Sequence, residues 1–111
     1  VKSGKVRALG TSGAKRSPSA PEIPTIAESG VPEFVVLNWQ GMLVPRKTPT
    51  AVVRQLHAAL VKTMALPGMS ETMIAQGLES ATNTPEQFGA LIRSEIEKYR
   101  KVVAAAGIKV D

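Results

Sequence analysis

The 111-residue sequence contains no cysteine, and this absence excludes disulfide bonds, thiolate nucleophiles and cysteine-based zinc sites. Aromatic residues are scarce as well, with two phenylalanines, one tyrosine and one tryptophan, so the core is expected to be mainly aliphatic. No apolar run approaches the roughly 20 residues that a membrane-spanning helix needs. The 43% of hydrophobic residues is nonetheless typical of a globular protein, and the length suits one domain.

Histidine is almost absent too, because His57 is the only one in the sequence. It falls within a predicted helix and has no acidic residue close to it in sequence, which favours a partly exposed helix residue over a catalytic base. One histidine and scattered glutamates also give no support for a metal site. We therefore predict that the chain is not an enzyme and has no catalytic residue, metal or cofactor.

Positive charge exceeds negative charge, with 14 Lys and Arg against nine Asp and Glu, for a net charge of +5. Nucleic-acid binding, attraction of a small anion and simple solubilising charge all compete to explain this excess. Proteins that bind nucleic acid cluster their basic residues on one face or in a tail. Here the basic residues are spread from Lys2 to Lys109 and alternate with acids near the C-terminus. A stand-alone basic domain that binds nucleic acid is therefore kept only as the alternative hypothesis.

Two segments have the composition of buried strands. Val6–Thr11 is a short, largely apolar run followed by a small polar cluster, and Phe34–Val44 is rich in branched and aromatic residues. The second run is interrupted by polar residues and by Gly41, and a glycine inside a strand often marks a bulge or a close approach of a ligand. Trp39 is either a core anchor or part of a ligand pocket, and its polar neighbours favour a pocket or a hinge.

Helix start and stop signals occur at four places along the chain. A Thr25–Glu28 capping box predicts a single helical turn over Thr25–Ser29, ended by Gly30. Further signals predict a helix with Thr48 as its N-cap and Pro49 as its first residue, a shorter one at about Ser70–Gln76, and a long one from a Thr84–Gln87 capping box to Ala106. Two strands and these helices predict a mixed α/β fold in which helices cover a sheet.

Two strands are too few for a stable closed sheet, because both edges stay open. The opening residues also contain neither an initiator methionine nor a signal-peptide pattern. We expect a chain cut from a longer sequence that supplies the missing strands. In this case the Val6 strand is expected to be mobile or to pair with another copy in a strand-exchanged oligomer.

Short motifs along most of the chain occur in a fixed order and spacing, and together they are similar to a known protein family. The motifs resemble the C-terminal portion of the solute-binding proteins of tripartite tricarboxylate transporters (TctC/Bug type). They are Lys15-Arg16-Ser17-Pro18, Pro24-Thr25 with Glu28 and Gly30, Trp39 with Gly41, Pro45 with Thr48-Pro49, and Gly77 with Thr84-Pro85.

This resemblance implies a C-terminal fragment of a two-lobed, type II periplasmic-binding-protein-like fold. Residues 1–33 would end the second lobe with a strand, a proline-rich loop and a short helical turn. Residues 34–47 would form the crossover or hinge strand between the lobes. Residues 48–111 would close the first lobe with two long helices.

The resemblance also implies a function in transport. The whole receptor would capture a small carboxylate anion in the periplasm and deliver it to the membrane permease subunits of the transporter. A sensor that presents its ligand to a signalling partner would share this fold. Residues carried over as ligand-binding are Thr11, Ser12, Asn38, Trp39 and Gly41, and we expect the fragment alone to bind weakly or not at all.

Overall fold

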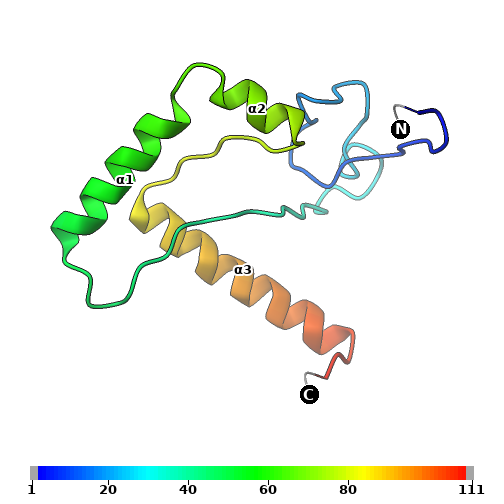
Figure 1. Cartoon of the computed structure of the whole chain (residues 1–111). Coiled ribbons are helices and arrows are strands. Elements are labelled where there is room, and N and C mark those ends of the chain that lie inside the picture. Colours follow the sequence, from blue (N-terminus) through cyan, green and yellow to red (C-terminus); the bar gives the residue numbers. More distant parts are fainter. Residues whose placement is uncertain (1–2, 110–111) are drawn as a thin grey trace. The chain divides into compact units, whose positions relative to one another are not determined.

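The computed structural model describes residues 3–109, and within them the regular structure is helical (Figure 1). The helices are α1 (Thr50–Met64), α2 (Met69–Ala75) and α3 (Pro85–Ala105). The chain divides into two compact units, which we describe separately. The first unit contains the residues up to Leu43 together with Ser70–Glu79, and the second contains Val44–Met69 and the residues from Ser80 onward.

Helix α3 begins and ends where the sequence predicts. The Thr84 hydroxyl accepts a hydrogen bond from the Gln87 backbone N–H at 3.2 Å, and the Gln87 side chain accepts one from the Thr84 N–H at 2.9 Å. This reciprocal capping box satisfies two backbone donors that the first turn would otherwise leave free. At the other end Gly107 has a positive φ of 62°, a conformation that costs glycine little, and it ends the helix.

Helix α1 corrects the prediction for its start. The N-cap residue is Pro49, with an extended ψ of 139° and no side-chain capping hydrogen bond, so Thr48 does not cap the helix as predicted. The Pro49 carbonyl accepts hydrogen bonds from the N–H groups of Val52 and Val53 at 2.9 and 3.2 Å. Since the proline carbonyl supplies the first helical acceptor, the helix begins at Thr50, one residue later than expected.

The two predicted strands are wrong for this chain. No strand forms among residues 3–109, and the only pairing of the β type there is an isolated parallel bridge between Thr11 and Thr25. Both Val6–Thr11 and Phe34–Val44 are otherwise without regular structure. A strand requires a neighbour that accepts and donates backbone hydrogen bonds, and within the described part of the chain neither segment finds one along its length.

Burial is slight throughout residues 3–109. None of the apolar side chains described there is buried, and Thr25, 2% exposed, is the buried residue. Large apolar side chains such as Leu9 and Leu43 keep about three quarters of their surface exposed, at 76% and 75%. Among these residues no helix has the length and apolar character needed to cross a membrane. The described residues therefore do not enclose a hydrophobic core of their own.

Candidate functional site

The Thr11–Thr25 bridge holds together two segments that are far apart in the sequence. The Thr11 N–H donates to the Pro24 carbonyl at 2.9 Å, and the Ile26 N–H donates to the Thr11 carbonyl at 2.9 Å. These two bonds fix the backbone of Thr11, a predicted ligand residue, against the residues on either side of Thr25.

Thr25 and Glu28 form the capping box that the sequence predicts. The Glu28 N–H donates to the Thr25 hydroxyl at 3.0 Å, and the Thr25 N–H donates to Glu28 Oε2 at 2.8 Å. The turn continues with a Ser29 N–H to Thr25 carbonyl bond of 3.2 Å, and Gly30 ends it with a φ of 112°. The prediction of one capped turn ended by a left-handed glycine is confirmed.

Arg16 connects the proline-rich loop to this turn. Its Nε lies 2.9 Å from Glu28 Oε2, and its Nη1 donates to the Pro21 carbonyl at 3.3 Å. The Thr25 N–H and the Arg16 guanidinium both lower the pKa of Glu28, the amide hydrogen bond being the larger cause and the arginine the second. The lowered pKa favours the carboxylate form of Glu28, which is the form that accepts from both partners.

Sequence reasoning did not find this pairing of Arg16 with Glu28. The two residues are twelve positions apart, and their approach depends on how the proline-rich loop folds back. The available signal was an arginine in that loop together with a glutamate at the third position of a capped turn. A glutamate already engaged in capping gives no indication in sequence that it also accepts an ion-pair partner.

The Thr11 hydroxyl is unusual because it is buried and lacks a hydrogen-bond partner within residues 3–109. Its Oγ1 atom has almost no contact with solvent and finds no hydrogen-bond partner among residues 3–109. A buried hydroxyl without a partner is costly, so its position needs an explanation, such as a water or a ligand that completes the hydrogen bond. The neighbouring Ser12 is exposed, and its carbonyl accepts a hydrogen bond from the Val36 N–H at 2.9 Å.

This Ser12–Val36 bond brings the second predicted segment to the first. Asn38, Trp39 and Gly41 follow Val36 within five residues, and all three are exposed in a stretch without regular structure. Trp39 retains 39% of its surface, so among the described residues it is not a core anchor. The structure thus connects the two predicted segments through a backbone hydrogen bond at Ser12.

His57 belongs to the second unit and behaves as predicted. The ring is half-buried, and Nε2 lies 3.1 Å from the Asn83 carbonyl, so the ring helps to hold α1 against the start of α3. Glu86 lies nearby and its pKa is lowered, first by its own backbone N–H and then by the Thr84 hydroxyl, with smaller contributions from His57 and Arg54. Residues 3–109 contain no group of three metal-binding side chains.

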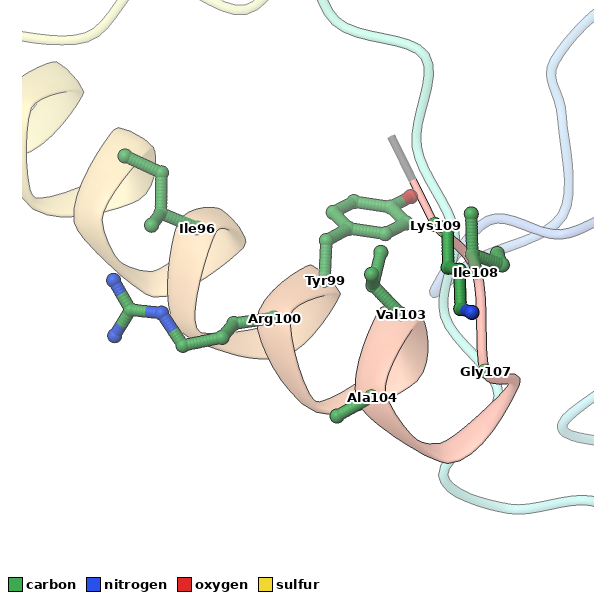
Figure 2. A pocket seen from close by; sticks show the side chains of 8 residues that line it. All are labelled: Ile96, Tyr99, Arg100, Val103, Ala104, Gly107, Ile108 and Lys109. Atoms are coloured by element: carbon green, nitrogen blue, oxygen red, sulfur yellow. The ribbon is translucent and has the colours of Figure 1, made fainter. Parts of the chain in front are cut away.

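An apolar groove lies at the C-terminal end of α3 (Figure 2). In Figure 2 the side chains of Tyr99 and Val103 extend from the helix toward Ile108. Ile96 and Tyr99 remain 52% and 42% exposed, so the groove is an open surface and not an enclosed ligand cavity. None of the predicted ligand residues lines it.

Comparisons with known proteins identify relatives of the whole chain. The family model described as the tripartite tricarboxylate transporter family receptor matches residues 1–108. The UPF0065 protein of the tcbD-tcbE intergenic region in Pseudomonas sp. strain P51 is 41% identical over 89% of the chain and 30% of its own length. Protein BugT of Bordetella pertussis is 32% identical over 99% of the chain and 34% of its own length. The chain thus spans about a third of the length of these relatives.

Two solved structures match nearly the whole chain, which corresponds to about a third of each. The periplasmic binding protein BugD has a TM-score of 0.80 and 35% identity, over 98% of this chain and 37% of BugD. The structure of R. palustris Rpa4515 with adipate has a TM-score of 0.79 and 31% identity, over 96% of this chain and 36% of Rpa4515. The predicted fold, part of a two-lobed periplasmic-binding-protein-like architecture, is confirmed. The strands predicted within the chain are the part of that prediction that fails.

Proposed function

The chain belongs to the tripartite tricarboxylate transporter receptor family, and from this premise we propose that it forms part of an extracytoplasmic solute-binding receptor. The receptor captures a small carboxylate anion in the periplasm and delivers it to the membrane permease subunits of a secondary transporter. The observation that carries this proposal is the family match over residues 1–108. The family consists of receptors and not of enzymes, so we assign no catalytic role to the chain.

Two independent observations support the ligand class. Rpa4515, to which the chain is 31% identical, has been solved with adipate, and adipate is a dicarboxylate. The chain also has a net charge of +5, which raises the local concentration of anions near its surface. Both support a small carboxylate as the ligand. The alternative, a stand-alone domain for nucleic acid, gains no support from the family or from the dispersed basic residues.

Within this chain we place the ligand contacts on two segments, residues 11–12 and 38–41. The Thr11 hydroxyl has no partner among the described residues, and it can donate to a carboxylate oxygen once its side chain turns toward solvent. The exposed Ser12 adds a second hydroxyl. The Ser12 carbonyl accepts a hydrogen bond from the Val36 N–H, and Asn38, Trp39 and Gly41 follow Val36 in the same stretch. Hydroxyl and backbone N–H donors suit a carboxylate without requiring an arginine.

The test uses a receptor chimera in which these 111 residues replace the matching third of Rpa4515. Thr11→Val and Ser12→Ala each remove one hydroxyl, and calorimetric titration with adipate is expected to show affinities weaker by roughly fivefold to tenfold. Thr11→Val is expected to leave thermal stability unchanged or improved, because it removes a buried hydroxyl that lacks a partner.

Ser19→Ala is the matched control, since the Ser19 hydroxyl lies 2.9 Å from the Ser17 hydroxyl in the proline-rich loop and has no proposed ligand role. Its adipate affinity is expected to equal that of the unsubstituted chimera. If Thr11→Val and Ser12→Ala both bind adipate as tightly as Ser19→Ala does, the ligand contacts proposed for residues 11–12 are wrong.

A further inference from the structure

We propose that Arg16 and Glu28 are positioning residues, which hold Thr11 and Ser12 in their ligand-binding conformation without touching the ligand. The inference rests on the proposed function, because it assigns the ligand to residues 11–12. It adds a role for two charged side chains that lie outside both ligand segments. The role follows from a continuous set of hydrogen bonds within the first unit.

The first link is a single carboxylate oxygen with two donors. Glu28 Oε2 accepts from the Thr25 N–H at 2.8 Å and from Arg16 Nε at 2.9 Å. Arg16 also donates through Nη1 to the Pro21 carbonyl at 3.3 Å. These contacts close the loop between Arg16 and Glu28, which are twelve positions apart, and they hold the Thr25 backbone N–H within it.

The second link carries this position to the proposed ligand residues. The residues on either side of Thr25, Pro24 and Ile26, hold the backbone of Thr11 through two bonds of 2.9 Å. Any displacement of Thr25 therefore displaces Thr11. The Ser12 carbonyl then accepts from the Val36 N–H at 2.9 Å, so the constraint reaches the segment that leads to Asn38.

Arg16 is the obvious candidate for a direct ligand anchor, and its contacts argue against that role. Two of its three guanidinium nitrogens donate within the loop, and its charge is matched by the Glu28 carboxylate. Both side chains are about half exposed, at 47% and 48%, so the ion pair itself contributes little stability. The proposed role of the ion pair is to position the Thr25 turn relative to Thr11.

The experiment compares four substitutions in the chimera described above. Glu28→Ala removes both the cap and the ion pair, and the adipate affinity is expected to fall about tenfold. Glu28→Gln keeps an acceptor for the Thr25 N–H, and Arg16→Gln leaves the capping box intact, so each is expected to cost about threefold or less. Glu22→Gln, a substitution of another exposed acid in the same loop, is the control and is expected to bind as the parent does.

Amide hydrogen exchange supplies a second readout that needs no ligand. Glu28→Ala is expected to accelerate exchange at Thr25, Ile26 and Val36, and Glu28→Gln is expected to restore most of the protection at Thr25. The same exchange measurement on the Glu28→Gln and Arg16→Gln chimeras keeps the proposal testable if the Glu28→Ala chimera does not fold.

Three results would overturn the proposal. In the first, Glu28→Ala matches Glu22→Gln in both adipate affinity and exchange. In the second, Glu28→Gln loses as much affinity as Glu28→Ala, which would assign the effect to charge and not to the turn. In the third, Arg16→Gln abolishes binding while the exchange rates stay unchanged, which would make Arg16 a direct contact. A parent chimera that does not bind adipate contradicts the proposed function instead, and the exchange rates still test the positioning role of Arg16 and Glu28.

Discussion

Glu28 acts at the residue scale through one oxygen that accepts from both a backbone amide and a guanidinium. Because its pKa is lowered in the folded turn, its contribution to the stability of the turn is fully present above the ordinary glutamate pKa. This contribution is lost as the pH falls through the lowered value. The turn that positions Thr11 is therefore expected to be intact at neutral pH and to loosen only in acid.

A carboxyl NMR titration of Glu28 tests this assignment. Arg16→Gln is expected to raise the Glu28 pKa, since it removes the second cause of the shift, but not to restore the ordinary value. The remaining depression comes from the Thr25 N–H, which the substitution leaves in place. A Glu28 pKa that is the same with and without the arginine would show that the ion pair does not form in solution.

At the scale of helices and strands, local signals were predictable except at the start of α1, and long-range pairing was not. The capped turn at Thr25 and the start and end of α3 lie where the sequence places them, because caps and left-handed glycines act within one turn. The strand assignments for Val6–Thr11 and Phe34–Val44 failed, because a strand depends on a partner that may be remote in sequence. The Arg16–Glu28 pair was missed for the same reason.

The two helix starts provide a matched pair for measuring the value of a cap. Thr84→Ala removes the hydroxyl that accepts from Gln87, and α3 is expected to lose about 1 kcal/mol of stability. Thr48→Ala is expected to change the stability of α1 very little, because α1 begins at a proline cap without a side-chain bond. Far-UV circular dichroism of the two variants during urea titration measures both effects, and equal losses would contradict the observed helix starts.

The candidate site was predicted only in part. Thr11 and Ser12 were chosen because small polar residues follow an apolar run, and the structure connects them to the Val36 segment by a backbone bond. That bond, like the Thr11–Thr25 bridge, joins residues whose proximity no local pattern encodes. Sequence therefore indicated which residue types suit a carboxylate, and the fold was needed to show which segments meet.

At the scale of the whole molecule, exposed apolar surface is the dominant feature. Within residues 3–109 no apolar side chain is buried, and the C-terminal half of α3 presents Ile96, Tyr99 and Val102 to solvent. Surfaces of this kind mark contacts with another part of a protein or with a partner. Since the chain spans about a third of the relatives that it matches, we expect the remaining parts of the family fold to cover this surface and to complete the ligand site.

The most direct test of the receptor assignment is a parallel calorimetric titration of the 111-residue chain and of the Rpa4515 chimera with adipate and other small carboxylates. We expect the chimera to bind at least one carboxylate, and the isolated chain to bind weakly or not at all, because the ligand site is shared with the rest of the fold. Micromolar binding by the isolated chain would contradict the shared site. A folded chimera that binds no carboxylate would contradict the receptor function itself.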